Sequence, residues 1–110
     1  MDDIEILTQA RELLAQPGKW TRQAFARDAA GEEMHGHEPS AVQFCAIGAI
    51  ERVTGQRHRT CAEPPVTALR ETIRGMVVGF NDSQSTVEPV LDVFDRTIAR
   101  LEAAQGAAGA

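Results

Sequence analysis

The stretch SAVQFCAIGAIERVTG, residues 40–55, carries the clearest helical signal in the chain. Its apolar side chains recur every three or four residues, and its first two turns are apolar on almost every side. That pattern is typical of a helix buried at the centre of a small domain. Ser40 is expected to cap this helix and Gly55 to end it. Small residues at its middle, Gly48 among them, would let another helix approach closely.

Apolar spacing predicts three further helices around this central one. The first covers residues 3–16, with Asp2 or Asp3 as its cap, and the next begins at Pro64-Pro65 and reaches residue 80. After a polar break at residues 81–84, a last helix runs to about residue 104. The predicted core consists of side chains from all four helices: Leu7, Leu14, Phe44, Ile47, Leu69, Ile73, Val90, Phe94 and Ile98.

Residues 19–39 lack the helical period and alternate in character instead, with turn-forming residues from Asp28 to Gly31. The pattern favours a short hairpin with strands over 21–27 and about 32–35, and an irregular loop is the alternative. The fold class expected is therefore mostly α. It is a compact four-helix domain over residues 1–104, with a small β-hairpin or irregular insertion between its first two helices and a flexible tail over 105–110.

Composition excludes several classes of protein. At 110 residues and 11.9 kDa the chain has room for one domain but not for a separate cofactor module. A net charge of -5 argues against a general nucleic-acid or membrane-surface binder. Two cysteines are too few for a disulfide framework, and there is neither a signal-peptide pattern nor a long apolar run. A cytoplasmic location is expected.

Cysteine and histidine supply few candidates for chemistry. Cys45 lies on the apolar face of the central helix, so a core position with a raised pKa is expected, and a nucleophilic role would need a nearby base. The zinc-ligand types in the chain match no structural zinc spacing, so neither metal nor cofactor is predicted, although metal binding by the loop residues stays open. These residues are His35, His37, His58 and Cys61.

Charged side chains offer weaker candidates. The chain has one basic region without an interleaved aromatic residue, so a solvated face is expected there; it consists of Arg52, Arg57, His58 and Arg59, with Arg70 and Arg74. Glu32/Glu33 and Asp92/Asp95 are the carboxylate pairs available for acid/base work, and Asp92 and Asp95 are expected on the solvated face of the last helix. No sequence signature of a P-loop, a dinucleotide site or a hydrolase nucleophile is present. No catalytic residue is therefore predicted.

Asn81-Asp82 is expected between two helices, where both residue types cap backbone donors. The functional alternative is that they face the hairpin and form a polar cleft for a small ligand or peptide. The candidate binding residues are then Trp20, Arg27, Asp28, Asn81 and Asp82.

The order of several motifs resembles a family of short bacterial and phage proteins known only as a domain of unknown function. They are a Trp after the first helix, Ala24-Phe25-Ala26-Arg27-Asp28, the block Phe44-Cys45-Ala46-Ile47-Gly48-Ala49, and Phe80-Asn81-Asp82 followed by Glu88-Pro89. The family pattern has Trp where this chain has Phe44 and Phe80. The resemblance covers about residues 7–100 and implies a shared fold, but no activity.

The function expected is a non-enzymatic cytoplasmic protein-interaction module of the kind that a mobile element encodes, with another protein as partner. The alternative is a small-molecule-binding or enzymatic domain. Its pocket would lie around Trp20, Arg27, Cys45, Asn81 and Asp82. The sequence leaves the oligomeric state and the identity of the partner open.

Overall fold

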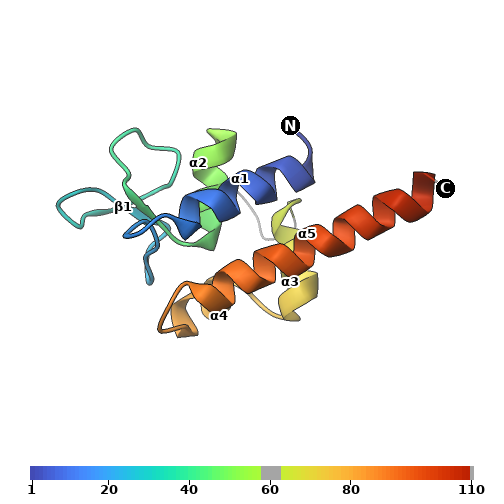
Figure 1. The fold of residues 1–110 in the computed structure, drawn as a ribbon. Helices are drawn as coiled ribbons and strands as arrows, with labels where there is room; N and C mark the ends of the chain where they lie inside the picture. The colour runs from blue at the N-terminus through green and yellow to red at the C-terminus, as the bar shows by residue number, and fades with distance from the viewer. Residues whose placement is uncertain (58–62, 110) are drawn as a thin grey trace.

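A computed structural model describes residues 1–57 and 63–109. The described residues form five helices and a small three-stranded sheet, so the fold is mostly helical as predicted. Figure 1 shows the sheet at one end of the molecule and the C-terminal end of the last helix at the other. The elements in chain order are α1 (Asp3–Ala15), β1 (Ala26–Arg27), β2 (Glu33–Met34), β3 (Gln43–Phe44), α2 (Ala46–Thr54), α3 (Val66–Ile73), α4 (Val77–Ser83) and α5 (Glu88–Gly109).

The first helix confirms its prediction. The Asp2 side chain accepts a hydrogen bond from the Glu5 amide at 2.8 Å, which caps α1 and places a negative charge at the positive end of the helix dipole. Its apolar face, with Leu7 and Leu14 fully buried, packs against α2 and α5. The helix ends at Ala15, two residues before Pro17.

The central helix begins later than predicted. Ser40 is not its cap: α2 starts at Ala46, Cys45 is the N-cap, and Gly55 ends the helix in the left-handed conformation as expected. Residues just before the cap belong to the sheet, because the Val42 amide donates to Arg27 and the Cys45 amide donates to Phe25. The apolar spacing of residues 42–45 is compatible with a helix, but their backbone hydrogen bonds to the β1 region place them in the sheet instead.

The predicted hairpin is present, with strands much shorter than expected. β1 pairs antiparallel with β2 through Ala26 and Met34, and on its other side with β3, giving the order β2-β1-β3. Residues 19–21 cover the outer edge of β3, where the Phe44 amide donates to the Lys19 carbonyl at 2.7 Å. The sequence does not predict a third strand, because residues 43 and 44 continue the apolar spacing of the central helix along the chain.

The long helix predicted from Pro64 to residue 80 is wrong, and this accounts for the fifth helix. Arg74 adopts a left-handed conformation (φ 60°) and ends α3, and the chain turns before α4 begins at Val77. Met76 is consequently half exposed rather than buried. The predicted polar break is also displaced: Asn81 to Ser83 form the last turn of α4, and the break follows at Gln84.

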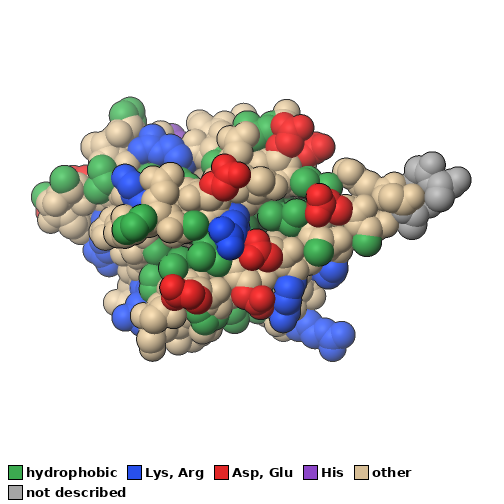
Figure 2. Space-filling model, viewed as in Figure 1, with side chains coloured by type: hydrophobic (Ala, Val, Ile, Leu, Met, Phe, Trp, Pro, Cys, Tyr) green, Lys and Arg blue, Asp and Glu red, His purple; other side chains and the backbone are tan. Residues whose placement is uncertain are grey.

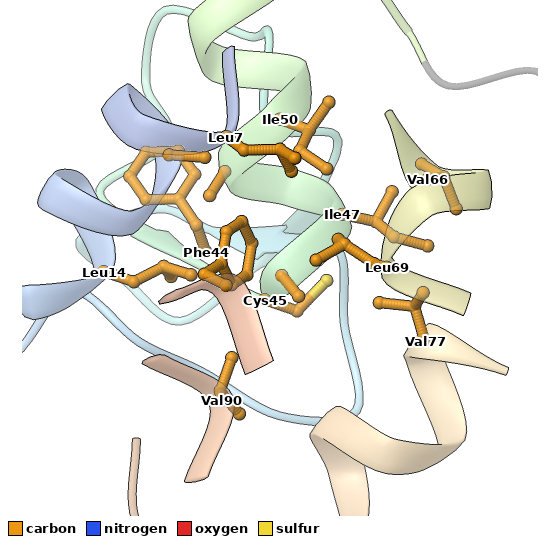
Figure 3. Close-up of a cluster of buried hydrophobic side chains, with 14 of the residues drawn as sticks. Leu7, Leu14, Phe44, Cys45, Ile47, Ile50, Val66, Leu69, Val77 and Val90 are labelled. Atoms are coloured by element: carbon orange, nitrogen blue, oxygen red, sulfur yellow. The ribbon is translucent and has the colours of Figure 1, made fainter. Parts of the chain in front are cut away.

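Helix α5 continues to Gly109, past the expected end at about residue 104. The core forms where α1, α2, α3, α4 and α5 meet the sheet, as the labelled side chains in Figure 3 show. Of the predicted core residues, Ile73 and Ile98 are only partly buried, and the others are buried. No helix within the described ranges combines the length and apolar character needed to cross a bilayer.

Gly48 is packed against loop backbone instead of the second helix that its small size suggested. A Cβ at this position would overlap the carbonyl oxygen of Phe25, and one at Gly36 would overlap the carbonyl oxygen of Gly48. The segment preceding β1, the segment following β2 and the start of α2 are therefore stacked backbone to backbone. Glycine is required at both positions because no side chain fits between these segments.

Candidate functional site

An open cleft of about 460 Å³ lies between α4, the segment preceding β1 and the strand β2. Its volume falls in the range of small-ligand and side-chain pockets. Most of its exposed lining is apolar. The lining residues are Gln23, Ala24, Phe25, Glu33, Met34, His35, Cys45, Val78 and Asp82.

The Asn81 side chain is fully buried and connects several segments of the chain by hydrogen bonds. Its Oδ1 accepts hydrogen bonds from the Trp20 indole at 2.8 Å and from the Ala46 amide at 3.1 Å. Its Nδ2 donates to the Thr21 carbonyl and to the neighbouring Asp82 carboxylate, both at 3.2 Å. One amide thus joins α4, the start of α2 and the segment after Trp20, which is a tertiary role and not the local capping that its sequence position suggested.

Asp82 faces the cleft beside this cluster. Its Oδ1 accepts from the amide of Gln23 at 2.8 Å, and Gln23 has a positive φ of 64°, a conformation that an L residue adopts only when it is held there. Asp82 therefore fixes the wall of the cleft that precedes β1.

Cys45 also lines the cleft, and its thiol is a poor nucleophile. Its Sγ accepts from the Gly48 amide at 3.3 Å as the N-cap of α2, and Figure 3 shows the side chain within the apolar cluster. Burial raises the pKa of the Cys45 thiol to about 12, outweighing the backbone hydrogen bonds that would lower it. The core position with a raised pKa expected from the sequence is confirmed.

His35 and Glu51 form a pair at the back of the cleft that the sequence pattern did not indicate. His35 Nδ1 lies 2.9 Å from Glu51 Oε2, and Glu51 Oε1 accepts from the Gly36 amide at 2.8 Å. The Glu51 side chain is 1% exposed, whereas that of His35 is 23% exposed and stacks on Phe25. One feature of the sequence does indicate a buried carboxylate. Glu51 lies one turn after Ile47 and Gly48, on the face of α2 predicted to be buried.

The other candidate binding residues are engaged in holding the hairpin. Arg27 donates to Thr21 Oγ1, to the Gly31 carbonyl and to the Arg22 carbonyl. Asp28 Oδ1 accepts from the amides of Ala30 and Glu32 and so forms the turn between β1 and β2. Of the pocket residues expected from the sequence, the structure places Asp82 and Cys45 on the cleft, while Trp20, Arg27, Asp28 and Asn81 do not line it.

The loop candidates for metal binding are only partly described. His58 and Cys61 lie outside the described residues, and the rings of His35 and His37 are 5.9 Å apart, centroid to centroid. Within residues 1–57 and 63–109, no three His, Cys, Asp or Glu side chains converge as a metal site would require.

The described members of the basic region differ in exposure: Arg57 and Arg74 are exposed as expected, whereas Arg52 and Arg70 are partly buried. Arg52 donates to the Ala41 carbonyl and lies 5.2 Å from the centre of the Phe44 ring, so this guanidinium packs on the protein itself. Figure 2 shows acidic and basic side chains intermixed over the face formed by α1 and α5. On that face Arg11 pairs with Asp95 at 3.0 Å. Asp92 and Asp95 are exposed, as predicted.

Comparison with known proteins identifies the chain only at the level of a family. A family model described as a family of unknown function, DUF6197, matches residues 1–100. No curated protein and no solved structure matches.

Proposed function

The chain belongs to DUF6197, a family of unknown function, and we propose that it is a non-enzymatic cytoplasmic module that binds another protein. The observation that carries the proposal is the open, largely apolar cleft between α4 and β2. A segment of the partner occupies this cleft and covers its apolar lining.

Exposed apolar side chains at the cleft support this function. Val78 on α4 lines the cleft and is 38% exposed, although neighbouring Val77 is buried. Phe25 and Met34 are partly buried and complete the apolar surface. Covering such side chains stabilises a complex by about 25 cal/mol per Å² of apolar area removed from water.

The chemistry of Cys45 also supports binding over nucleophilic catalysis. A thiol with a pKa of about 12 is almost entirely protonated at neutral pH, and the thiolate is the reactive form. The enzymatic alternative keeps one favourable observation, which is that His35, held by Glu51, lines the same cleft as Asp82. Against it, the side chains of Trp20, Arg27 and Asn81 are committed to internal hydrogen bonds.

Selection from a random peptide library displayed on phage tests the proposal, because it works without an identified partner. We expect enriched peptides to bind the wild-type protein and to lose at least tenfold in affinity for a Val78→Gln variant. Val42→Gln is the matched control, because Val42 is equally exposed at 38% and does not line the cleft. Enriched peptides that bind both variants as well as wild type, or no enrichment at all, would refute the function.

A further inference from the structure

We propose that the cleft recognises an arginine side chain of the partner protein through three hydrogen-bond acceptors. They are Nε2 of His35, the outer carboxylate oxygen of Asp82 and the carboxylate of Glu33. The inference rests on the proposed function and specifies the chemistry of its partner.

The first acceptor is set by the buried pair behind it. A carboxylate accepts hydrogen bonds and has none to donate, so at 2.9 Å from Glu51 Oε2 the proton of the neutral imidazole lies on His35 Nδ1. The other ring nitrogen, Nε2, then carries a lone pair on the side of the ring turned away from Glu51. Among the described residues Nε2 has no hydrogen-bond partner, and His35 lines the cleft.

The second acceptor lies across the cleft on α4. Both hydrogen bonds to the Asp82 carboxylate end on Oδ1, from the Gln23 amide at 2.8 Å and from Asn81 Nδ2 at 3.2 Å. Within the described part of the chain Oδ2 receives none, so this oxygen keeps its lone pairs for a ligand. Glu33 on β2 supplies the third acceptor from an exposed position at the rim.

An arginine side chain matches this arrangement in charge, shape and hydrogen bonding. Its guanidinium offers five N–H donors in a rigid fork and no acceptor, which suits the acceptors that His35, Asp82 and Glu33 contribute to the cleft lining. Its methylene stem would cover the apolar floor formed by Phe25, Met34 and Val78. The net charge of -5 also attracts a cationic segment over longer distances.

Nuclear magnetic resonance of the full chain tests the inference directly. Nitrogen-15 shifts of the His35 ring near pH 7.5 report the tautomer, and we expect the proton on Nδ1. A capped tripeptide Ala-Arg-Ala should then shift the amide signals of Val78 and Asp82. The same tripeptide with citrulline has nearly the same shape without the charge, and it should bind at least fivefold more weakly. A proton on Nε2, or equal binding of the two tripeptides, would overturn the inference.

Two variants separate recognition of the cation from general binding at the cleft. Asp82→Asn keeps the Oδ1 acceptor and turns the outer oxygen into a donor, and Glu51→Gln lets an amide donate to His35 Nδ1 and invert the tautomer. Each should remove the preference for arginine over citrulline, whereas Asp92→Asn, on exposed α5 surface outside the cleft, should retain it. If Glu51→Gln does not fold, the Asp82→Asn result and the wild-type tautomer still decide the question.

Failure of the inference is distinguishable from failure of the proposed function. If phage-selected peptides depend on Val78 and bind the Asp82→Asn variant unchanged, the function stands and arginine recognition is refuted. If the arginine tripeptide binds with the expected preference and no library peptide depends on Val78, the site for the cation stands and the protein-binding function is refuted.

Discussion

Replacing Gly48 by alanine tests the backbone stacking on which the cleft is built. Helix propensity alone predicts that Gly48→Ala in α2 stabilises the protein by about 1 kcal/mol. In the structure the added Cβ would overlap the Phe25 carbonyl oxygen and lie 2.7 Å from its carbon. The Phe25 carbonyl cannot retreat freely, because it accepts the Cys45 amide at 2.9 Å.

The size of the effect follows from these opposing contributions. Overpacking in a rigid site costs about 1–3 kcal/mol, and loss of the Phe25 to Cys45 hydrogen bond costs about 1 kcal/mol more. After the propensity gain is subtracted, Gly48→Ala should lower the free energy of unfolding by about 2 kcal/mol. Gly36→Ala should also be destabilising, because its Cβ would overlap the Gly48 carbonyl oxygen.

Urea titration followed by far-ultraviolet circular dichroism measures these changes. Gly79→Ala is the matched control, since Gly79 is also helical and an added Cβ there has no atom within 4 Å. That variant should be stabilised by about 0.5–1 kcal/mol. A Gly48→Ala protein as stable as wild type would show that the start of α2 and the Phe25 segment are not in contact as described.

Three further predictions concern single side chains. The pKa of Cys45 is about 12 in the folded protein against an ordinary 9.0. Stability should therefore be full below pH 9 and fall by about 1.4 kcal/mol per pH unit from there toward pH 12, as urea titrations at stepped pH would reveal. A Cys45→Ala protein should lack this slope; the chain has no tyrosine, so an unchanged slope would contradict the assignment. Asn81→Ala should lower the free energy of unfolding by about 3 kcal/mol, because the Trp20 indole and the Ala46 amide lose their acceptor; retained wild-type stability and Trp20 fluorescence would contradict this. Arg11→Ala should change stability by less than about 1 kcal/mol in thermal melts, since the Arg11 and Asp95 side chains are 35% and 54% exposed, and a larger loss would show that the pair is more than a solvated surface contact.

Much of the helical content is predictable from the chain alone. Local residue types and apolar spacing can be read directly from the sequence. They predict the cap at Asp2, the left-handed end of α2 at Gly55 and most of the core. The errors arose where a distant segment competes with that local pattern. Residues 42–45 satisfy a helical period, yet they pair with β1, and the apolar spacing across Arg74 continues although the chain turns there.

The candidate site was predictable in only two of its lining residues. Asp82 and Cys45 stood out by residue type and by their places in the motif order, and the structure puts both on one cleft. His35 and Glu51 did not stand out as a pair, because they are sixteen positions apart and on elements whose approach depends on two facing glycines. No one-dimensional pattern encodes the proximity of a loop imidazole to a buried helical carboxylate.

The sequence by itself therefore determined a small acidic helical domain, its family, and a buried thiol at the centre. Only the tertiary structure decided which polar side chains form internal hydrogen bonds and which line the cleft. The physical reason is that hydrophobic burial follows a period along the chain, whereas hydrogen-bond satisfaction depends on partners that folding brings together. Asn81 and Asp82 are adjacent in sequence, yet one is buried among four partners and the other lines the open cleft.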